Sequence, residues 1–136
     1  MLNFVQYLMS LIAAAIAPIP SQPELQAMTP CTPSIEPAIT VTVSDSRTRK
    51  PIEATVTVRD GSFQETLELN GVTATGQVIY GGAFERPGQY TVTISRDGYA
   101  TLVMMGVNVT KDQCHVVTRQ LTIDLQPIKP RPESLR

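Results

Sequence analysis

The sequence predicts an all-β domain with the architecture of a β-sandwich built from about seven short strands. Three observations lead to this prediction. Apolar and polar residues alternate along several segments, which is the pattern of a strand with one buried face. Turn-forming residues separate these segments at intervals of roughly 8 to 14 residues. No amphipathic helical segment lies between them, so a βαβ arrangement is not expected.

The first two predicted strands have the most regular spacing. In residues 38–44, isoleucine and valine alternate with threonine and serine, and the same alternation returns in residues 54–59. The intervening residues 45–51 are polar and end in proline, a composition typical of a hairpin loop. Asp60-Gly61 then predicts a tight turn.

Five further strands are predicted, at residues 63–69, 72–80, 90–95, 99–109 and 115–125. Asn70-Gly71 predicts the turn between the first two of them, and Gly81-Gly82 predicts a break where the chain can bend. Glu65 interrupts the alternation of the first. The strand that follows Pro87-Gly88 has the clearest alternation.

The ends of the chain differ in composition from the predicted domain. Residues 1–21 contain an apolar run of about the length of a signal-peptide core, shorter than the roughly 20 residues of a spanning helix, and are predicted to be a signal peptide or hydrophobic leader. No lysine or arginine precedes Arg47, so an uncleaved membrane anchor stays an alternative. Residues 22–37 are a proline-rich linker, 38–126 the folded domain and 127–136 a polar tail.

The composition narrows the classes of partner. The formal net charge is -1, so the chain has no basic excess that would attract nucleic acid. Tryptophan is absent and aromatic residues make up 5% of the chain, which disfavours a stacking platform for sugars or bases. A membrane is expected as a partner only through an uncleaved leader.

The two cysteines and the single histidine are the main candidates for chemistry. Cys31 precedes the first predicted strand and Cys114 the last, and in an oxidising compartment two cysteines indicate one disulfide, worth on the order of 4 kcal/mol by chain entropy. Two unpaired thiols are the alternative. His115 is the only histidine, which excludes a multi-histidine metal centre, and a structural role is expected for it.

Several segments together resemble the carboxypeptidase regulatory-like domain family. They are residues 39–45 (ITVTVSD), Lys50-Pro51-Ile52, residues 87–94 (PGQYTVTI) and Asp97-Gly98-Tyr99, and the resemblance covers about residues 38–110. It implies a transthyretin-like, or prealbumin-like, Greek-key sandwich of about seven strands. The sequence departs from the family at the first turn, where Arg49 or Lys50 replaces a glycine. Gly88 and Gly98 are expected in turns with unusual backbone angles, and Tyr90 and Tyr99 are expected to pack rather than bind a ligand.

The enzymatic uses of this fold are not expected here. Hydroxyisourate hydrolase has the fold but needs several histidines and a C-terminal Tyr-Arg-Gly-Ser signature, which this sequence lacks. Lysines 50, 111 and 129 lie in predicted loops or the tail, which disfavours the isopeptide cross-link of collagen-adhesin modules. The basic residues 47, 49 and 50 are expected to be a solvated loop tip rather than an anion site.

The expected function is therefore a non-enzymatic accessory or interaction module, exported to the periplasm or cell exterior, that meets a protein or glycan partner. The sequence shows no catalytic residues, metal site or cofactor motif. Two alternatives stay open: a carrier for a small ligand or carbohydrate, and a structural protein that associates with itself through exposed edge strands.

Overall fold

The computed structural model describes residues 15–19 and 30–129 of the chain, which divides into two compact units, Met1–Pro30 and Cys31–Arg136. In the first unit, residues 15–19 are exposed and form no regular secondary structure. Most of the predicted leader, and the predicted tail beyond residue 129, lie outside the described residues. Within these two ranges, no helix is long and apolar enough to cross a membrane.

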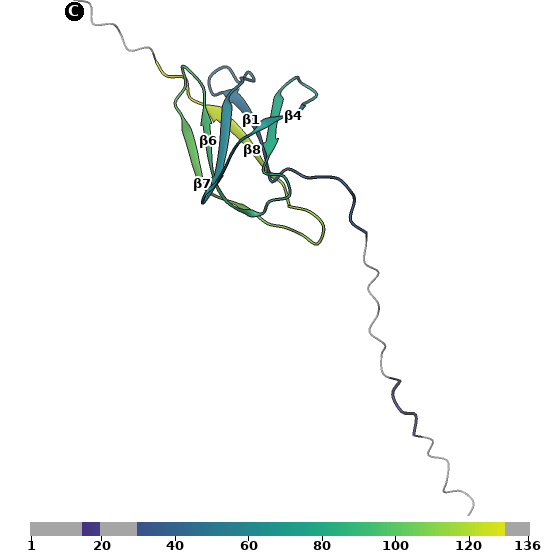
Figure 1. Cartoon of the computed structure of the whole chain (residues 1–136). Coiled ribbons are helices and arrows are strands. Elements are labelled where there is room, and N and C mark those ends of the chain that lie inside the picture. The colour runs from purple at the N-terminus through teal and green to yellow at the C-terminus, as the bar shows by residue number, and fades with distance from the viewer. Residues whose placement is uncertain (1–14, 20–29, 130–136) are drawn as a thin grey trace, which may run out of the picture. The chain divides into compact units, whose positions relative to one another are not determined.

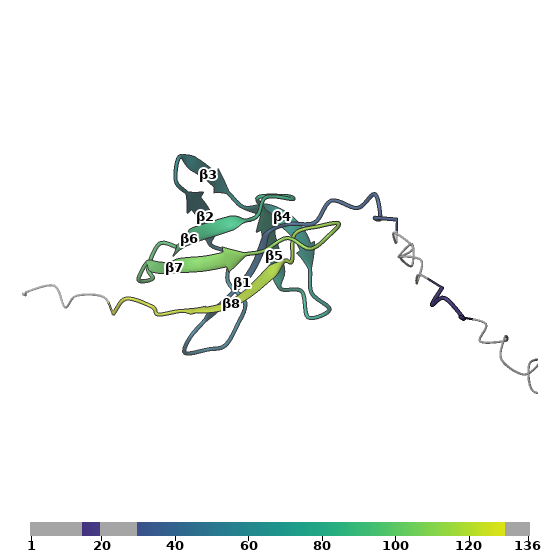
Figure 2. The ribbon, with the colours of Figure 1, turned by 90° about the horizontal axis from the view of Figure 1, so that it is seen from below.

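The second unit confirms the prediction of an all-β fold (Figure 1). Its strands form two four-stranded sheets, in the orders β4-β5-β1-β8 and β3-β2-β6-β7, and Figure 2 shows the strands of both. The bounds are β1 Ile39–Asp45, β2 Thr55–Asp60, β3 Phe63–Thr66, β4 Glu68–Val72, β5 Val78–Gly82, β6 Gly88–Ser95, β7 Leu102–Val109 and β8 Arg119–Leu125.

The pairing of β1 with β8 differs from the other pairings described. These two strands run parallel over seven residue pairs, from Ile39 opposite Arg119 to Asp45 opposite Leu125. On its other side β1 pairs with β5, and this pair is antiparallel, as are the remaining pairs in both sheets. The last strand therefore lies beside the first, at one edge of its sheet.

One hydrophobic core joins the two sheets. The predicted alternation of β1 is confirmed, because every second side chain from Ile39 to Asp45 is buried. Both sheets contribute apolar side chains to this core, among them Ile39, Val41, Val43, Ile123 and Leu125 from one sheet and Val56, Val58, Tyr90, Val92, Ile94, Val107 and Val109 from the other. Two sheets that share a core in this way fit a β-sandwich.

The described residues form eight strands where the sequence predicted about seven, because the predicted strand 63–69 is divided between the sheets. Its first part, β3, pairs with β2, and its second part, β4, pairs with β5. Leu67 lies between the two parts, is 4% exposed, and donates its amide hydrogen to the Val56 carbonyl at 2.8 Å. No glycine or proline marks the crossing, so the alternation alone does not reveal it.

The turn after β4 lies later in the chain than the sequence predicts. Asn70 and Gly71 lie inside β4, where the register with β5 shifts by a bulge, and the reversal occurs at residues 73–77. There the Thr73 hydroxyl accepts a hydrogen bond from the Gln77 amide at 3.0 Å. The predicted strand 72–80 is accordingly replaced by β5, which begins at Val78.

Gly81-Gly82, predicted as a break, lies within β5. A Cβ atom at Gly82 would be 2.6 Å from Oε1 of Glu65 and 2.7 Å from Cδ2 of Leu67. The missing side chain therefore makes room for two inward-facing neighbours, and no bend is needed there. Glu65, which interrupts the alternation of the predicted strand 63–69, has a structural role here. Its Oε2 accepts the Ala83 amide hydrogen at 3.1 Å.

Two turns agree with their predictions, whereas the start of the last strand differs. Residues 45–51 do reverse the chain as a hairpin does, since Ser44 and Pro51 form an antiparallel bridge and the Ile52 amide donates to the Val43 carbonyl at 3.0 Å. The chain then crosses to β2 in the other sheet, so β1 and β2 are not paired. The last strand begins at Arg119 rather than residue 115, because Asp112 Oδ1 accepts the amide hydrogens of Cys114 and His115, both at 2.8 Å, and turns the chain there. The turn at Asp60-Gly61 is confirmed, with Gly61 at a φ of 59°.

Candidate functional site

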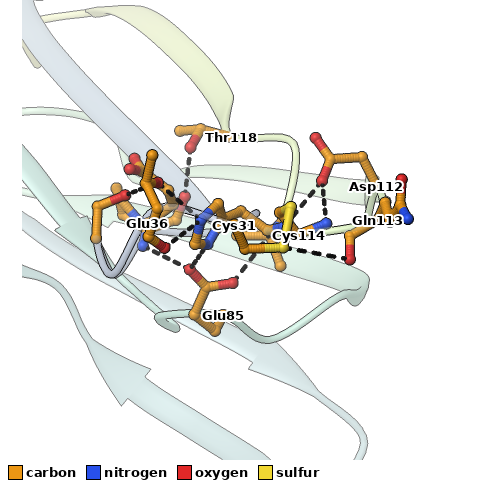
Figure 3. Close-up of polar contacts among 12 residues, drawn as sticks. Cys31, Glu36, Glu85, Asp112, Gln113, Cys114 and Thr118 are labelled. Atoms are coloured by element: carbon orange, nitrogen blue, oxygen red, sulfur yellow. Dashed lines mark hydrogen bonds and ion pairs between the residues drawn. A yellow bond between two sulfur atoms is a disulfide. The ribbon is translucent and has the colours of Figure 1, made fainter. Parts of the chain in front are cut away.

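The end of the proline-rich linker is fastened to the sandwich by a disulfide and a group of hydrogen bonds (Figure 3). The predicted disulfide between Cys31 and Cys114 is present, with the two Cα atoms 5.2 Å apart. It joins residues separated by 83 positions, so it closes a loop that contains β1 to β7. We call the residues that meet here the clasp: Cys31, Thr32, Glu36, Glu85, Cys114, His115 and Thr118.

Backbone contacts extend the clasp from the disulfide to the start of the sheet. The Thr118 hydroxyl donates to the Pro37 carbonyl at 2.7 Å, and the Arg119 amide donates to the Ala38 carbonyl at 2.9 Å. Glu36 and Glu85 are joined twice, because the Glu85 amide donates to the Glu36 carbonyl at 2.9 Å and the Glu36 amide donates to Oε1 of Glu85 at 2.8 Å. The last residues of the predicted linker thus belong with the sandwich.

His115 is held through both ring nitrogens. Nδ1 lies 2.7 Å from Oε1 of Glu85, and Nε2 lies 3.1 Å from both the carbonyl and the hydroxyl oxygen of Thr32. The second Glu85 oxygen accepts the Val116 amide hydrogen at 3.2 Å. The histidine therefore connects the linker end to the loop between β5 and β6.

The electrostatics of the clasp favour the charged forms of both side chains. The hydrogen bond from the Glu36 amide, together with the contact to His115, lowers the pKa of the Glu85 carboxyl. The hydrogen bond to Glu85 raises the pKa of the His115 imidazole. Between these two pKa values, the carboxylate and the imidazolium form an ion pair.

Glu85 is a residue of the clasp that the sequence did not predict. It lies in the connection from β5 to β6 with a φ of 52°, in the left-handed region that residues with a side chain rarely adopt. Its carboxylate makes long-range contacts in both directions along the chain, to Glu36 and to His115. Neither feature has a local sequence signal, because each depends on which loops the fold brings together.

A second polar cluster joins two segments of the family resemblance. Oδ1 of Asp45 accepts the amide hydrogens of Arg47 and Thr48 at 2.7 and 2.9 Å, and Oδ2 accepts the Tyr99 hydroxyl hydrogen at 2.6 Å. The Tyr99 hydrogen bond is the main cause that lowers the pKa of the Asp45 carboxyl to about 2, and it raises the pKa of Tyr99. Tyr99 therefore stabilises the turn after β1.

The basic loop tip is exposed, as expected. Arg49 adopts a φ of 62°, and its guanidinium forms an ion pair with Oδ2 of Asp124 at 2.6 Å. Arg47 and Lys50 are exposed beside it. Asp124 therefore offsets one of the three positive charges of this loop.

An open cleft lies at the end of the sandwich opposite the clasp. Val78 at the start of β5 and Ser95 at the end of β6 line the cleft, whereas Glu85 of the clasp lies between the end of β5 and the start of β6. The volume of the cleft is about 970 Å³, and its lining includes Leu69, Tyr80, Arg96, Tyr99 and Ile128. The Arg96 guanidinium carbon lies 5.9 Å from the centre of the Tyr99 ring. No pattern in the sequence predicts this cleft.

No protein-family model matches the chain, and no curated protein matches it. In the part of the chain that the structure describes, no group of three or more histidine, cysteine or acidic side chains is placed to hold a metal ion.

Proposed function

We propose that the chain is an exported, non-enzymatic interaction module, in which the clasp fixes a proline-rich linker to a rigid β-sandwich that meets a protein or glycan partner. The clasp carries this proposal, because it joins the end of the linker to the sandwich by one covalent bond and several hydrogen bonds. Because the linker is attached at one end of the sandwich, the other end of the sandwich is left available to a partner. The disulfide is consistent with export to an oxidising compartment.

The roles of the polar side chains support a non-enzymatic function. His115 contacts Glu85 and Thr32 through its two ring nitrogens, and the Asp45 carboxylate accepts three hydrogen bonds within its own cluster. A general base needs an accessible lone pair beside the substrate. These groups are already engaged in joining one part of the fold to another.

The family resemblance belongs to the same proposal. We assign the sandwich to the transthyretin-like Greek-key class, since Arg49 has a positive φ where the family pattern has glycine, and Asp45 and Tyr99 of two resembling segments bond to each other. A left-handed conformation is what a turn glycine would supply.

A panel of ester, peptide and hydroxyisourate substrates tests the non-enzymatic assignment on purified protein. The expected result is no turnover above buffer. The proposal would be overturned if the native protein turned over one of these substrates and the variant His115→Ala did not. Export is tested separately by treating protein from the cell envelope with a thiol-alkylating reagent. Because both cysteines are expected to be in the disulfide, the intact mass is expected to show no added alkyl group.

The cleft favours a second function, that of a carrier for a small amphipathic molecule or sugar. Its lining combines exposed Leu69 and Ile128 with two tyrosines and Arg96, and such mixed pockets bind organic ligands. A thermal-shift screen distinguishes this function. The carrier function would be favoured if one chemical class of ligand raised the melting temperature of the protein and the variant Tyr80→Ala lost this increase.

Self-association is the third candidate, through the edge strand β7, where Met105 is 81% exposed and Val103 is also exposed. Size-exclusion chromatography of the full chain is expected to give a monomer if the interaction module is correct. A dimer that Val103→Lys dissociates would favour self-association.

A further inference from the structure

The position of the disulfide along the chain determines how the domain responds to tension. Cys31 precedes β1, and Cys114 lies between β7 and β8. The shortest covalent path from the linker to the residues after β8 therefore crosses the disulfide and follows only residues 114–125. The seven strands β1 to β7 lie on the closed loop and are bypassed.

We infer that the oxidised domain is a force-transmitting module: tension between the segment before Cys31 and the segment after Leu125 passes through the disulfide and along β8, and leaves residues 32–113 folded. The inference does not depend on which molecule the module meets. It adds a mechanical function to the proposed one.

The strand β8 suits this path because it is already extended. A strand rises about 3.3 Å per residue, close to the maximum reach of a chain, so β8 gains little length when it is pulled along its own axis. Only residues 114–118 have slack, which amounts to less than roughly 20 Å. The clasp limits this slack further, since His115 and Thr118 are bound to Glu85 and Pro37.

Without the disulfide the same tension takes another route. It enters at Ile39, the first residue of β1, and leaves at Leu125, the last residue of β8. Because these strands are parallel and in register over seven pairs, the two forces slide them past one another and load their hydrogen bonds together. Once they separate, the chain from Cys31 to residue 126 becomes free to extend, up to roughly 330 Å.

Single-molecule stretching of the full chain, with handles fused at both ends, tests the inference. The oxidised protein is expected to show no extension step larger than roughly 20 Å from the domain. Adding a reductant while the tension is held is expected to release one step of roughly 300 Å. The variant C31A/C114A is the matched control and is expected to give the large step without reductant.

Two results would overturn the inference. A large step in the oxidised protein would show that the disulfide does not divert the tension from β1. A total extension far below roughly 300 Å after reduction would show that the disulfide is not what keeps residues 32–113 folded under tension. If C31A/C114A does not fold, the reductant arm on the native chain still gives either result, because that chain folds with its disulfide formed.

Discussion

Removal of the disulfide is expected to lower the free energy of unfolding by about 4.5 kcal/mol. The chain-entropy relation contains a constant of about 2.1 cal/mol/K and a term that grows as 1.5R times the logarithm of the loop length, and the separation of 83 residues gives this value at 25 °C. The double variant C31A/C114A is the suitable perturbation, because a single substitution would leave one reactive thiol.

Urea denaturation followed by far-ultraviolet circular dichroism measures this change. The cross-linked chain stays more compact when it unfolds, so the oxidised protein is also expected to have the smaller dependence on urea concentration. The native protein in reductant is the control, since it removes the bond without altering a side chain. A loss below about 1 kcal/mol in both cases would refute the entropic reasoning.

Three further predictions concern single side chains. Arg49→Gly is expected to be more stable than Arg49→Ala by about 0.5 to 1 kcal/mol in urea denaturation, because both lose the ion pair but only glycine relieves the positive φ; equal stability would contradict this. Gly82→Ala is expected to cost roughly 1 to 3 kcal/mol by crowding Glu65 and Leu67, and a cost below about 0.5 kcal/mol would argue against crowding. The raised pKa of His115 means that its contact with Glu85 stabilises the fold below the unfolded pKa of about 6.5 and that this contribution is lost as pH rises through the folded pKa. Urea denaturation from about pH 6 to 9 is expected to show this loss in the native protein and not in His115→Gln.

The periodicity of the sequence was sufficient to predict the buried faces of β1, β2, β6 and β8. Val41 and Val43, or Val92 and Ile94, recur at every second position, and burial of one face requires that spacing. The disulfide was predictable as well, since two cysteines in an oxidising compartment allow only one intramolecular pairing. These features depend on local spacing or on residue count, which the sequence states directly.

The clasp and the division of the predicted strand 63–69 depend on what the fold brings together. Alternation continues through Leu67 although the chain changes sheets there, because a buried side chain suits both the strand and the crossing. Glu85 has no partner near it in sequence, and its contacts lie 30 and 49 positions away. Side chains whose role is set by such distant contacts have no local periodicity to mark them.

The order of elements explains why the clasp needs hydrogen bonds as well as a disulfide. β8 is the one described strand outside the covalent loop, and the strand beside which it pairs is β1. The disulfide alone would not fix the register of β1 and β8, because residues 32–38 and 115–118 separate it from the two strands. The bonds from Thr118 to Pro37 and from Arg119 to Ala38 set that register at the first pair. The covalent bond therefore limits how far the ends can separate, and the hydrogen bonds determine how they align.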